Sequence, residues 1–231
     1  MKKNGSLKSM VEQFSTTIGN LTIKTFHFNF VRVNTYIVYD DTKEAVIIDP
    51  GNHAQEENQQ LFDFIAKKEL TVKYILVTHT HFDHIFGIQF AKEQYQVPFL
   101  MHPAALLVYS QAGTYLKILE HQEGGFPPPD GFIEEGEIIS FGHQQLEILY
   151  VPGHCDGSIC LYDPNNKVLF TGDVLFYENL GRTDLPTGDY DILVNGIKEK
   201  LLPLEEEVTV FPGHGNTTTI GHEKLQIPYL K

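Results

Sequence analysis

Three histidines and one aspartate lie within six consecutive residues in the first half of the chain. The stretch 79–84 reads His-Thr-His-Phe-Asp-His, and it supplies His79, His81, Asp83 and His84. Imidazole nitrogens and carboxylate oxygens at this density are typical of ligands for Zn, Fe or Mn. Taken alone, the stretch has an alternative interpretation as a polar loop that happens to be rich in histidine.

Three later stretches share a second pattern, in which an apolar run is followed by glycine and then by a potential metal ligand. They end in Gly153-His154, Gly172-Asp173 and Gly213-His214. Glycine at the end of a strand lets the backbone turn tightly, so the next side chain can point into a shared crevice. Together with the apolar run before His79, these stretches favour one metal site built from four strand ends over an isolated polar loop.

The residues around 79–84 predict the elements that hold this turn in place. The apolar run 74–77 indicates a buried parallel strand. A helical pattern follows over 83–96, with Asp83 suited to the N-cap and Gly87 allowing another segment to approach closely. The turn would therefore lie at the carboxyl end of a strand, where open α/β sheets bind their ligands.

The remaining pattern predicts strands followed by helices, twice along the chain. Strands are expected at 21–26, 33–39, 44–48, 98–101, 137–141, 145–151, 158–162, 167–171 and 207–211, and helices at 56–70, 103–120 and 189–202. This order predicts an α/β protein with two packed sheets and helices outside, an αββα four-layer sandwich. We expect a single domain over 21–231, preceded by a flexible lead-in over 1–20.

Composition limits the classes of partner and the compartment. A chain of 231 residues suits one domain, and a net charge of −13 argues against nucleic acid and anionic membrane surfaces, so a small-molecule substrate is expected. The sequence has no membrane-length apolar stretch and no signal-like start, and it contains only two cysteines, Cys155 and Cys160. These features predict a cytoplasmic protein, and they leave its oligomeric state open.

The order of the four motifs resembles the metal-binding pattern of the metallo-β-lactamase superfamily, over roughly 21–214. The resemblance implies the αββα fold and two metal ions at the edge of the sandwich. By motif matching, the first ion would be bound by His79, His81 and His154, and the second by Asp83, His84 and His214. Asp173 would bridge the two ions.

A further segment, Gly-Arg-Thr-Asp-Leu-Pro at 181–186, resembles that of glyoxalase II-like hydrolases and of persulfide dioxygenase-like proteins. Arg182 could bind a substrate carboxylate through two hydrogen bonds. The alternative is a structural link between Arg182 and Asp184 that braces the loop behind the metals.

The implied chemistry is metal-dependent hydrolysis of a thioester, of the glyoxalase II type. Two divalent ions, with Zn expected and Fe or Mn as alternatives, lie about 3.5–4 Å apart in such sites and lower the pKa of a shared water towards ~7. The bridging hydroxide would attack the carbonyl carbon, and Asp83 would orient it. Typical glyoxalase II enzymes continue into a helical glutathione-binding domain, whereas only residues 215–231 follow His214, so the identity of the thioester stays open.

Other functions fit the same ligand set. They include a mononuclear-iron persulfide dioxygenase, a lactonase-like or other hydrolase of the superfamily, and a metal-binding scaffold without catalysis. The loop at 124–129, rich in glycine and proline, could be a lid over the site or a connector between the two halves.

Overall fold

The computed structural model describes residues 15–120 and 126–227. Most of the predicted lead-in, residues 1–14, lies outside the described residues. Its last part is not a lead-in, because Ser15–Ile18 forms strand β1 and pairs antiparallel with the start of β2 (Leu21–Phe28). The polar and β-branched residues of β1 add an exposed edge strand through the two-residue turn at Gly19 and Asn20.

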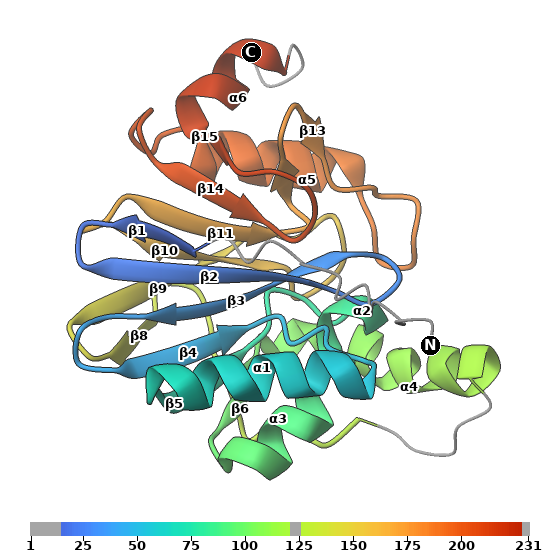
Figure 1. The fold of residues 1–231 in the computed structure, drawn as a ribbon. Coiled ribbons are helices and arrows are strands. Elements are labelled where there is room, and N and C mark those ends of the chain that lie inside the picture. Colours follow the sequence, from blue (N-terminus) through green and yellow to red (C-terminus); the bar gives the residue numbers. More distant parts are fainter. Residues whose placement is uncertain (1–14, 121–125, 228–231) are drawn as a thin grey trace, which may run out of the picture.

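Two sheets form the centre of the molecule (Figure 1). The first has its strands in the order β1 to β7, and its further members are β3 (Val33–Tyr39), β4 (Glu44–Ile48), β5 (Thr71–Leu76), β6 (Phe99–Met101) and β7 (Gly131–Phe132). Strands β1 to β4 pair antiparallel, whereas β4 to β7 pair parallel. The predicted parallel strand before His79 is therefore β5, between two parallel neighbours.

The second sheet has the order β15-β14-β11-β10-β9-β8. Its strands are β8 (Ile138–Phe141), β9 (Gln144–Tyr150), β10 (Ile159–Asp163), β11 (Val168–Gly172), β14 (Thr209–Pro212) and β15 (Thr218–Thr219). A separate hairpin consists of β12 (Leu175–Phe176) and β13 (Asn179–Leu180). Strands β11 and β14 run parallel, so the residues that follow them leave the sheet at the same edge.

Helices cover the outer faces of both sheets (Figure 1). The first sheet is covered by α1 (Gln55–Lys68), α2 (Phe82–Ile85), α3 (Ile88–Tyr95), the short 3-10 helix η1 (Pro103–Ala105) and α4 (Leu106–Glu120). The second is covered by α5 (Tyr190–Gly196), the π-helical turn η2 (Ile197–Leu201) and α6 (Ile220–Gln226). The predicted αββα sandwich is confirmed. Among the described helices, none combines the length and apolar character needed to cross a bilayer.

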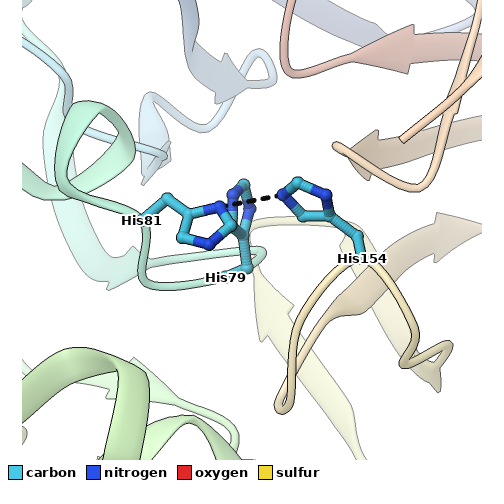
Figure 2. Close-up of side chains that lie close together, drawn as sticks. All are labelled: His79, His81 and His154. Carbon is cyan, nitrogen blue, oxygen red and sulfur yellow. Dashed lines mark hydrogen bonds between the residues drawn. The ribbon is translucent and has the colours of Figure 1, made fainter. Parts of the chain in front are cut away.

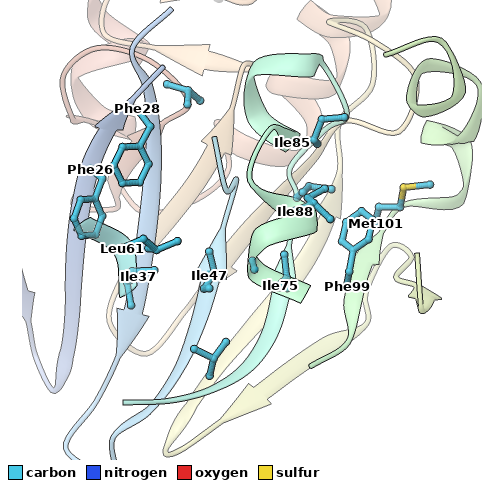
Figure 3. Packing of buried hydrophobic residues seen from close by; sticks show 14 of the residues in the cluster. Phe26, Phe28, Ile37, Ile47, Leu61, Ile75, Ile85, Ile88, Phe99 and Met101 are labelled. Carbon is cyan, nitrogen blue, oxygen red and sulfur yellow. The ribbon is translucent and has the colours of Figure 1, made fainter. Parts of the chain in front are cut away.

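Three apolar clusters hold these four layers together. Phe26, Ile37, Leu61 and Ile75 pack between the first sheet and its helices (Figure 3). The cluster between the two sheets includes Val38, Ile48 and Phe170, and the outer cluster of the second sheet includes Leu169 and Leu193. Adjacent residues such as Ile37 and Val38 thus enter different clusters. A strand buried on both faces has this continuous apolar pattern.

The predicted helix over 83–96 is two helices, because α2 ends at Ile85 and α3 begins at Ile88. Its start also differs from the prediction, since His81 is the N-cap and Asp83 lies in the first turn. The close approach expected at Gly87 is confirmed, because a Cβ there would lie 2.0 Å from Asn52 Oδ1. Gly87 N also donates to the Pro50 carbonyl at 2.7 Å, so this contact fixes the bend.

The loop at 124–129 is described only from Phe126 onward. Tyr109 of α4 donates to the Pro127 carbonyl, and Lys92 of α3 donates to the Pro128 carbonyl at 3.2 Å. The described end of the loop is therefore fastened to these two helices.

Asp40 ties the two sheets together at the end of β3 that lies away from Val33. Its Oδ2 accepts hydrogen bonds from His143 N, just before β9, at 2.7 Å and from Nε2 of Gln144, the first residue of β9, at 2.9 Å. Its Oδ1 accepts from Thr42 N at 3.0 Å. Burial would raise the pKa of the Asp40 carboxyl, but the hydrogen bonds from Thr42, Gln144 and His143 outweigh burial and hold the pKa below its usual range.

Replacing Asp40→Asn should lower the free energy of unfolding by about 1–3 kcal/mol, because an amide donor would then face the donors of His143 or Gln144. Since the folded-state pKa of Asp40 is the lower one, its contribution is present at neutral pH and is lost as the pH falls through that pKa. Urea unfolding at neutral and acidic pH measures both effects. The control is Asp41→Asn, which removes the same charge from the neighbouring exposed residue; an equal effect of the two variants would contradict the role of Asp40.

Candidate metal centre

The structure brings all seven predicted ligands together at one edge of the sandwich. They follow the ends of β5, β9, β11 and β14, so both sheets contribute to the cluster. Three groups of side chains have potential ligand atoms within 4.8 Å of one another. The first group is His79, His81 and His154. The second is His79, His84 and Asp173, and the third is Asp83, His84 and His214.

The first group consists of three imidazoles that face a common point (Figure 2). His81 Nδ1 lies 2.9 Å from His154 Nε2, and the ring of His79 lies 4.8 Å from each of the other two rings. His154 Nδ1 donates to the Arg182 carbonyl at 2.8 Å, which fixes the proton on that nitrogen and leaves Nε2 free as an acceptor. The loop after Asp173 therefore orients a histidine of the first group through its backbone.

The third group contains Asp83, His84 and His214, with Asp173 beside them. His214 Nε2 lies 3.1 Å from Asp83 Oδ2, and His84 Nε2 lies 3.3 Å from Asp173 Oδ1. Asp173 Oδ2 is 3.7 Å from Nε2 of both His154 and His214. The Asp173 carboxylate thus lies between the first and the third of these groups.

Close packing at this point depends on Gly213. A Cβ on Gly213 would lie 2.3 Å from Asp173 Oδ1 and 2.6 Å from His84 Cε1. Any larger residue would push the backbone before His214 away from the cluster. This contact is the physical reason for a glycine before this ligand.

The electrostatics of the cluster leave His79 and His81 neutral and Asp173 ionised at neutral pH, which are the forms that bind metal. Burial, with the neighbouring His154, lowers the pKa of His81 to about 4, and burial, with the neighbouring His84, lowers the pKa of His79 well below its usual value. Burial would raise the pKa of Asp173, but His84 and the other histidines more than reverse this effect and lower it. The carboxylates of Asp173, Asp83 and Asp49 conversely overcome burial and raise the pKa of His84. The carboxylates around His84 therefore attract positive charge to this point.

Three buried polar atoms in the cluster lack a well-directed hydrogen bond, and they are His79 Nε2, His84 Nε2 and Asp173 Oδ1, the last two of which face each other at 3.3 Å. A buried polar atom without a partner costs about 1–3 kcal/mol, so native proteins rarely leave several together. These atoms belong to one of the three candidate groups. The residues present therefore fit divalent metal ions, for which imidazole and carboxylate are suitable ligands.

Asp49 is a residue of the site that the sequence interpretation missed, because it treated the residues after 48 only as the end of a strand. Asp49 Oδ1 accepts from Thr78 N at 2.7 Å, and Oδ2 accepts from Thr78 Oγ1 at 2.7 Å and from His84 Nδ1 at 2.9 Å. The carboxylate thereby joins β4 to the turn at 79–84 and directs His84 Nε2 into the cluster. The signal was available, since Asp49 also ends an apolar strand and is followed by a proline and a glycine.

Asn34 and Tyr36 were also missed, and they hold the loop that carries His214. Asn34 Nδ2 donates to the carbonyls of Pro212 at 2.9 Å and Gly215 at 3.0 Å, and Tyr36 Oη donates to Pro212 at 2.6 Å. These bonds fasten a loop of the second sheet to β3 of the first. No local pattern in the sequence indicated this contact.

A cavity of about 630 Å³ opens beside the cluster, and His81, Asp83, His154, Asp173 and His214 line it. Arg182 also lines it, as a substrate contact would require. However, Arg182 Nε and Nη2 each donate to the Asp184 carboxylate at 2.7 Å. The structure thus contains the Arg182–Asp184 link that the sequence left open.

Comparisons with known proteins agree with this geometry. The family model described as the metallo-beta-lactamase superfamily matches residues 29–214. The hydroxyacylglutathione hydrolase GloC of Haemophilus influenzae is 37% identical over 212 residues, which cover 85% of this chain and 92% of that protein.

Two solved structures have a similar fold. The BLEG-1 B3 metallo-beta-lactamase has a TM-score of 0.81 at 34% identity, covering 90% of this chain and 99% of that one. TTHA1623 in a di-iron-bound form has a TM-score of 0.79 at 33% identity, covering 89% of this chain and 99% of that one. With the ligand cluster at the sheet edges and the family model spanning both sheets, the chain belongs to the metallo-beta-lactamase superfamily.

Proposed function

We propose that the protein is a metal-dependent hydrolase that cleaves a thioester by chemistry of the glyoxalase II type. The observation that carries the proposal is the Asp173 carboxylate between two groups of imidazole and carboxylate ligands at the cavity. The Haemophilus influenzae relative, which is named a hydroxyacylglutathione hydrolase, supports the choice of a thioester.

Two divalent ions would occupy the cluster. His79, His81 and His154 would hold one ion, Asp83, His84 and His214 would hold the other, and Asp173 would contact both. We propose Zn for a ligand set made of nitrogen and oxygen atoms, with Fe or Mn as alternatives; the di-iron form of TTHA1623 supports keeping Fe. When bound, such a pair lowers the pKa of a shared water towards about 7 and stabilises negative charge on the substrate carbonyl oxygen.

Asp83 is the residue that would orient the attacking water. It lines the cavity, and one of its oxygens lies 3.1 Å from His214 Nε2. Burial would raise its pKa, but His84 and the hydrogen bond from His214 lower it, so the carboxylate is ionised at neutral pH. An ionised carboxylate can accept a hydrogen bond from the water and direct its lone pair towards the carbonyl carbon.

The two cysteines are not nucleophiles in this proposal. Both are free and buried, and burial raises the pKa of the Cys155 thiol to about 12. Burial likewise raises the pKa of Cys160, so neither thiol forms the reactive thiolate at neutral pH. Free thiols are usual in a reducing compartment, which supports a cytoplasmic location.

The purified protein should bind about two divalent ions per chain and hydrolyse members of a panel of small thioesters, because the cluster has ligands for a metal pair. Metal analysis and release of free thiol measure the two properties, and a chelator should remove both together until metal is restored. One iron per chain, with oxygen uptake on a persulfide and no thioester hydrolysis, would instead identify a persulfide dioxygenase. Turnover of lactones alone would identify a lactonase.

The variant Asp173→Ala should lower both the metal content and the kcat/KM for the best thioester, the latter by more than about 100-fold. Loss of a group that supports a metal ligand already lowers affinity or activity by about 10–100-fold, and loss of a ligand itself should cost at least as much. The matched control is Asp191→Ala, which removes an exposed carboxylate on α5. Full activity of Asp173→Ala with both metals retained would refute the bridging role.

The variant Asp49→Asn should weaken binding of one of the two ions by about 10–100-fold, because His84 would lose the carboxylate that orients it. Competition with a chromogenic chelator measures the two affinities separately. Asp63→Asn, on α1, is the control for loss of one carboxylate. If the two variants bind both ions equally well, Asp49 does not support the site.

A further inference from the structure

The β12–β13 hairpin forms part of the cavity wall beside the candidate metal centre. Its first strand begins just after Asp173, and Phe176, Asn179 and Leu180 of the hairpin line the cavity. The ring of Phe176 lies 6.4 Å from the ring of His214, so this aromatic side chain stands next to a candidate metal ligand. The position of the hairpin therefore decides how much apolar surface a bound ligand meets beside the reactive centre.

This hairpin is too short to keep its place unaided. Each of its strands has 2 residues, and together they form a separate two-stranded sheet. Even longer isolated hairpins are only marginally stable in water. Its base is fixed, because Thr171 Oγ1 donates to the Leu175 carbonyl at 2.8 Å and Gly181 N donates to the Val174 carbonyl at 3.2 Å. Its turn, which contains Glu178, needs support from outside the hairpin.

Glu223 of α6 provides that support. It is the one buried glutamate among the described residues, with 0% of its surface exposed. Its Oε2 accepts from Glu178 N at 2.9 Å, and its Oε1 accepts from the hydroxyl of Thr218 in β15. Glu178 has a φ of 55°, in the left-handed region that residues other than glycine seldom adopt. The Glu223 carboxyl group thus holds the turn in a conformation that its own backbone does not favour.

A buried carboxyl group at position 223 has a cost in stability. Taking such a group out of water is unfavourable unless hydrogen bonds compensate, and an apolar side chain would avoid the cost altogether. An apolar side chain, however, would leave Glu178 N without this acceptor. The contacts of His222 with Tyr177 and with Glu178 Oε1, at 5.0 Å between rings and 3.1 Å, lie nearer the surface and hold the turn less firmly. The gain from Glu223 is therefore a fixed hairpin.

We propose that Glu223 is a positioning residue that determines specificity, because it keeps Phe176 at the cavity and so lets the site bind an alkyl chain next to the reacting carbonyl. Glu223 acts through the hairpin and contacts none of the reacting atoms. The inference rests on the proposed hydrolysis of a thioester at the same site. It deepens that function by naming the part of the substrate that the hairpin selects.

The first test uses thiols that cannot be hydrolysed, so its result does not depend on catalysis. A thiolate binds zinc directly, so 2-sulfanylethanol and 6-sulfanylhexan-1-ol share this contact with the zinc-loaded protein and differ only in their alkyl chains. Calorimetry should show that the longer thiol binds about tenfold more tightly, because its additional methylene groups are buried against the wall. A wild-type protein without this preference would overturn the proposal.

Two variants of Glu223 separate its hydrogen bond from its bulk. Glu223→Leu keeps the position filled and removes the acceptor, so the preference for the longer thiol should fall to about twofold. Glu223→Gln should keep most of the preference, since its amide oxygen can accept from Glu178 N while its NH2 group donates to Thr218 Oγ1. An unchanged preference in Glu223→Leu would contradict the role of Glu223.

The control for a general loss of stability is Leu61→Ala, which opens the buried cluster under α1 on the other sheet. This variant should leave the preference unchanged, and a fall equal to that in Glu223→Leu would reduce the effect to stability alone. Amide exchange in residues 175–181 should become faster in Glu223→Leu while β5 stays protected. Equal exchange of 175–181 in the wild type and Glu223→Leu would show that Glu223 does not hold the hairpin.

A double-mutant cycle tests whether Glu223 acts through Phe176. Phe176→Ala should lower the preference for the longer thiol by a factor similar to that of Glu223→Leu. In the Phe176→Ala background, Glu223→Leu should lower it no further, because the contact through which it acts is already gone. Additive effects of the two substitutions would show that Glu223 acts by another route, and they would overturn the proposal.

The second test compares S-acetyl- and S-hexanoyl-N-acetylcysteamine as substrates. Glu223→Leu should raise KM for the hexanoyl thioester about fivefold and leave kcat unchanged, because it weakens binding of the chain without altering the reactive centre. A fall in kcat with loss of metal would instead show a structural role and overturn the proposal. If neither thioester is cleaved while the thiol preference depends on Glu223, the proposed hydrolysis fails and the positioning role stands. If both are cleaved and Glu223→Leu changes no preference, hydrolysis stands and the positioning role fails.

Discussion

Buried carboxylates and imidazoles that face one another without enough protons to satisfy them are the central constraint of this structure. His79 Nε2, His84 Nε2 and Asp173 Oδ1 are enclosed by protein and lack a well-directed hydrogen bond. Burial disfavours charge on the histidines, while the carboxylates around His84 require a positive charge nearby. Divalent cations satisfy both requirements, because they accept the lone pairs of neutral imidazoles and offset the carboxylates.

The rest of the fold serves to hold these atoms close together. Each ligand follows a strand end, and the strands come from two sheets that are packed through the apolar cluster between them. Contacts between the sheets then fix the details, as when Asn34 of β3 holds the loop of His214 and Asp49 after β4 holds His84. Asp40 ties the sheets together at the far end of β3. The geometry of the cluster therefore depends on how the two sheets are placed on each other.

The cavity beside the cluster has two parts with different roles. The ligands at its base provide the reactive centre, whereas α4, the β12–β13 hairpin and the loop after it provide the apolar wall. Members of one superfamily can keep the metal-binding ligands and change the residues of the cavity wall. Substrate specificity therefore has to be argued from the wall of each protein. In this chain, Glu223 of α6 supports the β12–β13 hairpin of that wall through Glu178 N.

The sequence by itself determined the sandwich and the seven residues that meet at its edge. Three local patterns indicated them: the strand periodicity, the glycine before each of the later ligands, and the dense turn at 79–84. A local pattern can be recognised from the sequence without knowledge of the fold. Tertiary structure alone decided the rest. Asn52 against Gly87 divides a helix that looks continuous, and Asn34 reaches Pro212, 178 positions away. The conformation of the 181–186 loop turns Arg182 towards Asp184. Such contacts depend on which distant surfaces pack together, and neither periodicity nor spacing along the chain encodes that choice.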